Sequence, residues 1–177
     1  KGAVNPSIFG GRASVFWQVP VTGRLAKKHV TVLEALGPCI NTIQNEHAAQ
    51  GYELVHTGDA SAAGAMLLFT CKAPNMIYMR RRLEETSAFQ SLRSWWLHKA
   101  GWNNALCDAG SRNYRELFAD LCKAYGIKPV VTQRENLRQE ARDFIRDVEE
   151  HTSDYLCSSN DAAEAFMQEL RRQPSRV

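Results

Sequence analysis

The chain has 177 residues, of which 44% are hydrophobic and 23% are charged. These proportions are typical of globular proteins and exclude disorder over the whole chain. Lys and Arg number 22 against 19 Asp and Glu, giving a net charge of +3, so nucleic-acid binding would need a local basic patch rather than overall charge. The longest apolar run, residues 65–69, is too short for a membrane-spanning helix.

Strand and glycine signals dominate the first 74 residues. Apolar and polar side chains alternate over residues 14–21, as in a strand with one buried face. Gly37 and Pro38 favour the start of a helix, because proline loses no hydrogen bond at the first helical position. The alternative is an earlier helical turn, since Leu33 and Leu36 continue the apolar stripe backwards and the helix would then bend at Pro38. The predicted order is a loose arm at 1–13, a strand at 14–21, a helix from Pro38 to Gly51, a strand at 52–57, a hairpin loop at 58–64 and a strand at 66–72.

The junction between this helix and the next strand reads AAQGYELV at residues 48–55. It resembles the helix-to-strand junction of a small bacterial domain family of unknown function, whose members share a helix ending in Ala-x-x-Gly followed by an aromatic residue, Glu, Leu and Val. The resemblance covers residues 14–73, about a third of the chain. It implies a β-α-β-β fold and no active site, because the family has no established chemistry.

The chain beyond Pro74 reads almost entirely as helix. Helix starts are predicted near Asn75, Ser87, Ser111, Thr132 and Asp161, and helix ends at Gly101 and Gly126. The fold class is therefore α+β: a small antiparallel sheet with one packed helix (β-α-β-β), followed by a helical C-terminal half. The predicted domains are residues 14–74 and 75–172, after the loose arm and before a disordered tail at 173–177.

No catalytic, metal or cofactor motif is visible. The five cysteines contain no pair within four positions, no two histidines have i, i+4 spacing, and neither glycine-containing loop matches a phosphate-binding pattern. Carboxylate pairs fall on predicted solvated helix faces. We therefore predict reduced thiols, no cofactor and no metal, and leave enzymatic activity open, with the balance against it.

One cluster combines cations with aromatic rings. Its candidate binding residues are Arg80, Arg81, Arg82, Arg93, Trp95, Lys99 and Trp102. Arg and Trp are enriched in protein-binding hot spots and also suit single-stranded nucleic acid. The alternative is that the tryptophans fill the core while the arginines pair with carboxylates such as Glu84 and Glu85.

These observations favour a non-catalytic cytosolic adaptor or regulatory protein that binds another macromolecule. The alternative is a nucleic-acid-associated accessory factor using residues 80–102, and an enzyme ranks third. A strict helix-turn-helix is rejected because about six residues separate the helices around Gly126. No signal-peptide pattern is present, which favours the cytoplasm, although a removed leader and a homo-oligomer both stay open.

Overall fold

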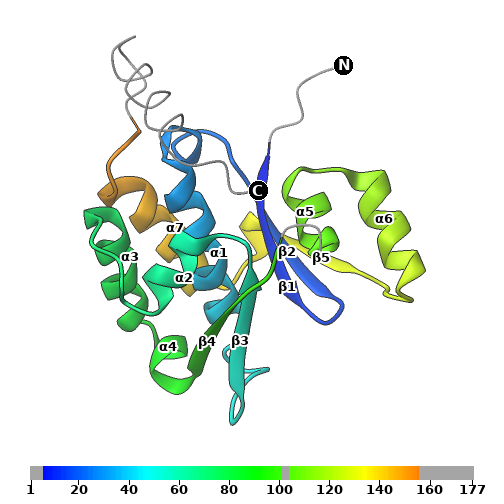
Figure 1. The fold of residues 1–177 in the computed structure, drawn as a ribbon, viewed down its shortest axis with the longest axis horizontal. Helices are drawn as coiled ribbons and strands as arrows, with labels where there is room; N and C mark the ends of the chain where they lie inside the picture. Colours follow the sequence, from blue (N-terminus) through cyan, green and yellow to red (C-terminus); the bar gives the residue numbers. More distant parts are fainter. Residues whose placement is uncertain (1–5, 101–103, 156–177) are drawn as a thin grey trace.

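The computed structural model describes residues 6–100 and 104–155. The strands are β1 (Ser7–Arg12), β2 (Val15–Pro20), β3 (Glu53–Gly58), β4 (Arg93–His98) and β5 (Val130–Gln133). The helices are α1 (Val30–Gln44), α2 (Ser61–Leu67), α3 (Pro74–Glu84), α4 (Ser87–Ser91), α5 (Ala105–Ser111), α6 (Arg115–Ala124) and α7 (Gln139–His151), with 3-10 turns at Leu25–Lys27 and Arg134–Asn136. The predicted α+β class is confirmed. Figure 1 shows α1, α2, α3, α4 and α7 on one side of the molecule and α5 and α6 on the other, and both α1 and α5 pack against β1.

The first sheet has the order β1-β2-β5, with β1 and β2 antiparallel and β5 parallel to β2. The strand predicted at residues 14–21 is confirmed, but the loose arm predicted at 1–13 is wrong for β1. Gly10 lies opposite Trp17, and a Cβ at this glycine would come within 2.5 Å of the indole. The glycine that suggested a loop therefore makes room for a large neighbour across the hairpin.

The second sheet consists of β3 and β4, which run parallel. The helix predicted from Ser87 is wrong beyond α4, because Leu92 already has extended backbone and β4 follows. Adjacent side chains of a strand point to opposite faces, so Trp96 is half-buried against the core while Trp95 is 51% exposed. The single antiparallel sheet of the β-α-β-β prediction is replaced by a mixed sheet and a parallel one.

The strand predicted at residues 66–72 is also wrong. The chain forms α2 here and then turns at Phe69, whose φ of 57° is left-handed. Ala63, Met66 and Leu67 are buried at the i, i+3, i+4 spacing of a helix face. A short apolar run fits a buried strand and a buried helix equally well, which explains the error.

Helix α1 begins eight residues before the predicted start at Pro38. His29 caps it, because its Nδ1 accepts a hydrogen bond from the Thr31 backbone N–H at 3.1 Å. Pro38 therefore lies inside the helix, where it cannot donate to the carbonyl of Glu34. Together with Gly37 it leaves this side of α1 with little side-chain bulk.

The C-terminal half departs from the prediction in its details. The stretch between the predicted helix end at Gly101 and the predicted helix start at Ser111 contains α5, and Ser111 ends that helix instead of starting the next one. The helix start predicted at Thr132 lies instead in β5, which a 3-10 turn follows, so α7 starts only at Gln139. The predicted end of α6 at Gly126 is confirmed by a left-handed φ of 67°. The helix predicted near Asp161 and the tail at 173–177 lie outside the described residues.

One hydrophobic core joins the two sides of the predicted domain boundary. Its fully buried side chains include Ile40 of α1, Leu83 of α3 and Phe144 of α7. The strands β3 and β4 also pair across this boundary. Within the described part of the chain, no helix is long and apolar enough to cross a membrane.

Candidate functional site

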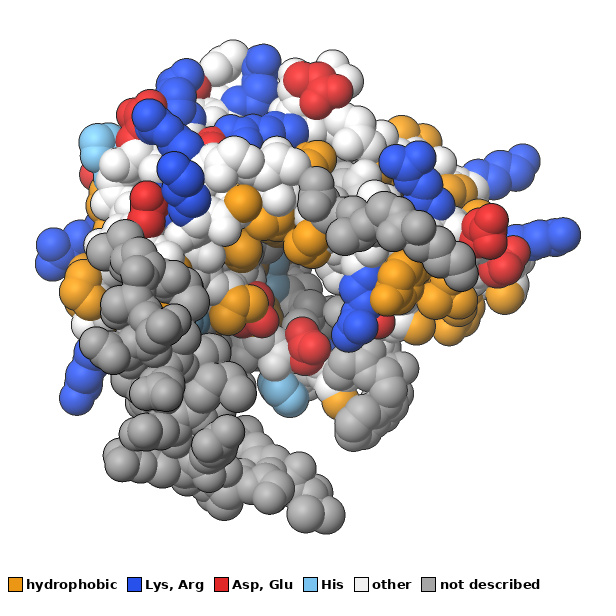
Figure 2. All heavy atoms as spheres, turned by 90° about the horizontal axis from the view of Figure 1, so that it is seen from above, with side chains coloured by type: hydrophobic (Ala, Val, Ile, Leu, Met, Phe, Trp, Pro, Cys, Tyr) orange, Lys and Arg blue, Asp and Glu red, His pale blue; other side chains and the backbone are white. Residues whose placement is uncertain are grey.

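A cleft of about 480 Å³ lies between the two sheets. One wall comes from β1 and α5, and the other from β3 and α1. Figure 2 looks down on this side of the molecule and shows a hollow near its centre, with acidic side chains at the rim. The cleft reaches the carboxyl end of β3, and ligands of α/β proteins commonly bind at the carboxyl ends of parallel strands.

The free edges of both sheets border this cleft. Residues 7–11 of β1 and residues 55–58 of β3 line it without a gap. Alternate side chains of a strand point to opposite faces, so a continuous run of lining residues indicates the strand edge. In the described part of the chain, the ladder of β1 is with β2 and that of β3 is with β4, which leaves the facing edges unpaired.

Aromatic rings and glycines shape the inner walls. Trp17 is buried, and its Nε1 donates a hydrogen bond to Asn41 Oδ1 at 3.1 Å. Trp96 lies against Gly58 and Gly64, where a Cβ would come within 2.7 Å and 2.5 Å of the indole. The glycines thus let two tryptophans approach the backbone and form an apolar lining.

Three carboxylates line the cleft: Glu34 from α1, Asp59 directly after β3 and Asp108 from α5. Asp108 is paired with Arg112 at 2.9 Å. Among the described residues, neither Glu34 nor Asp59 has a hydrogen-bond or ion-pair partner. Burial raises the pKa of the Glu34 carboxyl, and the negative charge of Asp59 raises it further. The two acids therefore repel each other, and no described cation forms an ion pair with either of them. Lys99 lies at the same end of the cleft, where its backbone N–H donates to the Gly58 carbonyl at 2.7 Å.

A neutral histidine also lines the cleft. His56 is 4% exposed, and burial lowers its pKa to about 4. Its Nε2 lies 3.2 Å from the Thr42 hydroxyl, which donates its proton to the Pro38 carbonyl at 2.8 Å. The hydroxyl oxygen must therefore accept from the imidazole, which assigns the proton to Nε2.

The thiol that lines the cleft is not activated. Burial raises the pKa of Cys107, although the positive charge of Lys99 acts in the opposite direction. The thiol therefore stays protonated and is a poor nucleophile near neutral pH. Cys39, Cys71 and Cys122 are likewise unbridged, as predicted, and Cys157 lies outside the described residues.

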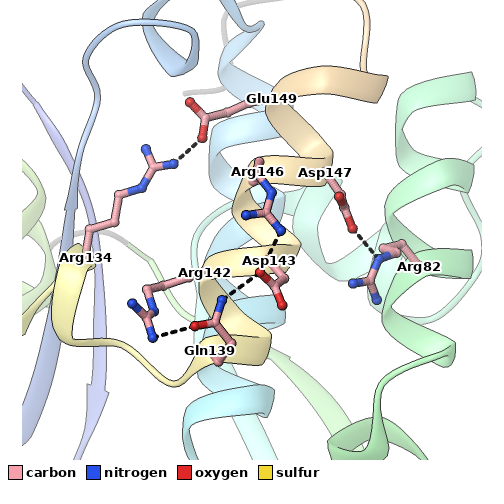
Figure 3. Close-up of polar contacts among 8 residues, drawn as sticks. All are labelled: Arg82, Arg134, Gln139, Arg142, Asp143, Arg146, Asp147 and Glu149. Atoms are coloured by element: carbon pink, nitrogen blue, oxygen red, sulfur yellow. Dashed lines mark hydrogen bonds and ion pairs between the residues drawn. The ribbon is translucent and has the colours of Figure 1, made fainter.

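A second groove lies between α3 and α7. Asp147, Glu150 and His151 bring potential ligand atoms within 4.8 Å of one another. Asp147, however, is already paired with Arg82 at 2.8 Å, as Figure 3 shows, and Arg81 lines the same groove. Two guanidinium groups beside the carboxylates oppose a metal cation, so this groove has little support as a metal site.

The predicted binding cluster is divided between several surfaces. Arg80 pairs with Glu84 at 2.9 Å, as the packing alternative proposed, and its guanidinium lies 4.5 Å from the Phe89 ring centroid. It also donates to the Leu67 carbonyl. Arg80 and Arg82 thus join α3 to its neighbours, and only Arg81 of the three is exposed.

The other predicted residues lie on or near β4. Arg93 and Trp95 are exposed on one face of the strand, and Lys99 follows its end near Cys107. Trp102 lies outside the described residues. The structure therefore separates Arg80 and Arg82, which have partners, from the exposed β4 face.

The cleft acids Glu34 and Asp59 were not among the predicted site residues. Asp59 carried a usable signal, because it follows a predicted strand directly after Gly58. Glu34 carried none, since a single acid within an apolar stripe reads as the solvent side of a helix.

A comparison with protein-family models finds no match, and searches of curated proteins and of solved structures find none either. The resemblance of residues 14–73 to a bacterial domain family therefore stays a prediction. Function has to be argued from the geometry and charge of the cleft.

Proposed function

We propose that this protein is a non-catalytic binding protein that takes up a positively charged organic group, an ammonium or guanidinium, in the cleft between its two sheets. The observation that carries the proposal is the pair Glu34 and Asp59, two carboxylates that repel each other and have no ion-pair partner among the described residues. A bound cation would interact favourably with both.

The surroundings of the pair are partly apolar. Glu34 and Asp59 are themselves exposed, so solvent screens their charges in part, while the tryptophan-lined wall and the buried, uncharged His56 provide an uncharged surface in the same cleft. An aromatic wall beside carboxylates also suits ammonium and guanidinium groups, which interact well with indole faces. A phosphate or carboxylate ligand would instead be repelled.

The absence of catalysis in this proposal rests on two side chains. Cys107 is held in its thiol form, and the Nε2 proton of His56 is committed to Thr42. Neither is paired with a group that would activate it as a nucleophile or base in the described structure. Binding without chemistry is the simpler use of the site.

The nucleic-acid alternative has less support. Phosphate binding needs free cations, and Arg80 and Arg82 are engaged with carboxylates and aromatic rings. The acidic cleft would also repel a phosphate backbone. Among the predicted α3 and β4 arginines, Arg81 and Arg93 remain exposed for such a role.

The proposal is tested by titrating the full chain with N-acetyl-lysine methylamide and following the indole N–H signals of Trp17 and Trp96 by NMR. We expect saturable shifts that weaken at least tenfold in Glu34→Gln/Asp59→Asn. The matched control is Glu85→Gln, which removes an exposed carboxylate in the other groove and should leave the affinity unchanged. Equal binding by the double variant, or no saturable shift, would overturn the proposal.

A further inference from the structure

The facing edges of β1 and β3 point to a specific kind of ligand. We infer that the cleft receives an extended segment of a partner protein, which adds as a strand between these two edges and places a Lys or Arg side chain against Glu34 and Asp59. The inference rests on the proposed function, because it identifies the carrier of the positive charge.

Two strand edges line the cleft continuously. Residues 7–11 and 55–58 present their unpaired edges to the same space. An exposed strand edge carries N–H and C=O groups that favour pairing with another chain. A segment lying between two such edges pairs on both sides, as in strand addition by peptide-binding proteins. A small free amine would leave these backbone groups unpaired.

The two carboxylates fix the position of the basic residue along the segment. Asp59 directly follows β3, and Glu34 lies on α1 at the same end of the cleft, since its pKa responds to Asp59. A strand running beside β3 therefore passes both carboxylates where β3 ends. The basic side chain belongs to that end of the segment, and residues beside Val55 lie deeper along the edge.

An exposed apolar strip beside the cleft favours a ligand that belongs to a protein. Val55 lines the cleft and is paired in register with Trp95, while Leu97 lies two residues further along the same face. Their exposed fractions are 53%, 51% and 58%. This strip continues the cleft outward over the second sheet. A partner that inserts a strand at the edge can cover Trp95 and Leu97 with its own surface.

The nature of the segment is tested by selecting nine-residue peptides, randomised at every position, from a display library against the full chain. We expect the enriched peptides to contain a Lys or Arg beside β-branched or aromatic residues. Selected peptides should bind at least tenfold more tightly than N-acetyl-lysine methylamide. They should lose at least tenfold in affinity in Glu34→Gln/Asp59→Asn and keep it in Glu85→Gln.

Strand addition has its own readout. Amide hydrogen exchange of β1 and β3 should slow when a selected peptide binds, whereas N-acetyl-lysine methylamide should leave it unchanged. Methylation of alternate backbone nitrogens of the peptide should weaken binding at least tenfold. Peptides without an enriched basic residue, or without protection of both strands, would overturn the inference. Binding of N-acetyl-lysine methylamide that persists in that case would leave the proposed function standing.

Discussion

Carboxylates on the outer face of α7 have ion-pair partners, whereas Glu34 and Asp59 in the cleft have none among the described residues. On α7, Asp147 is paired with Arg82 of α3, Glu149 with Arg134, and Asp143 with Arg146 (Figure 3). In the cleft, no described residue pairs with Glu34 or Asp59. Unpaired like charges oppose folding, so the contrast supports the proposed ligand-binding role of these acids.

Helix α1 packs against α7 through the core and also lines the cleft. One side of it is packed into the core by Ile40 and Leu36, which are fully buried. The other side carries Glu34 and Asn41 into the cleft, next to the small surface left by Gly37 and Pro38. The same helix therefore holds the site rigidly from behind and leaves space in front of it.

The largest expected effect is a loss of stability when a side chain of the hydrophobic core is truncated. Phe144 is fully buried between α7 and its neighbours, and Phe144→Ala should lower the free energy of unfolding by about 3–5 kcal/mol, because it removes apolar contacts and leaves a cavity. Urea denaturation followed by tryptophan fluorescence measures the change. Leu97→Ala, at an exposed position of the cleft-side sheet, is the matched control and should cost well under 1 kcal/mol. Similar losses of unfolding free energy in both variants would contradict the placement of Phe144 in the core and of Leu97 on the surface.

A smaller expected effect is a pH dependence of stability that arises from His56, which is buried and lines the cleft. The pKa of His56 is about 4 in the folded chain against 6.5 for an ordinary imidazole. Between these values the unfolded chain binds a proton that the folded chain does not, so stability falls as the pH drops from about 6.5 towards 4. The loss between pH 7.5 and pH 5 should be about 2 kcal/mol.

Denaturation curves of the wild type and His56→Gln at both pH values isolate this contribution. The variant should lose most of the pH dependence that His56 provides. The raised pKa of Glu34 acts with the opposite sign, because its folded form gains a proton more readily, so Glu34→Gln serves as a second reference. An unchanged pH dependence in His56→Gln would show that the imidazole is not held neutral.

The sequence predicted elements whose signals are local. The alternation around Trp17, the glycine that ends α6 at Gly126 and the buried stripe of α7 at Phe144 all correspond to the structure. The prediction failed where the conformation of a residue depends on a neighbour that is distant in the sequence. Gly10 is a strand residue because Trp17 lies across the hairpin, and Trp95 belongs to a strand because β3 pairs with it.

The candidate site could not be predicted for the same physical reason. Glu34 and Asp59 are 25 positions apart and belong to different elements, so only the packing of α1 beside β3 brings their charges together. The pairing of Arg82 with Asp147, across 65 positions, was equally invisible. Local patterns identify which residues carry charge, while the fold decides which of them find a partner.

The smallest expected effect is a change in the free energy of unfolding that has opposite signs in the two regions. Glu34→Gln removes a repelling charge and should raise the free energy of unfolding, by no more than about 0.5 kcal/mol because solvent screens this partly exposed group. Asp147→Asn removes one partner of the Arg82 ion pair and should instead lower it, by about 1 kcal/mol or less. Thermal unfolding at low salt measures both, and added salt should shrink both differences. If Glu34→Gln proved destabilising, a positive charge would already stabilise the two carboxylates, and a cationic ligand would lose its support. A site that is maintained for binding predicts the opposite result, a small gain in stability together with weaker ligand binding.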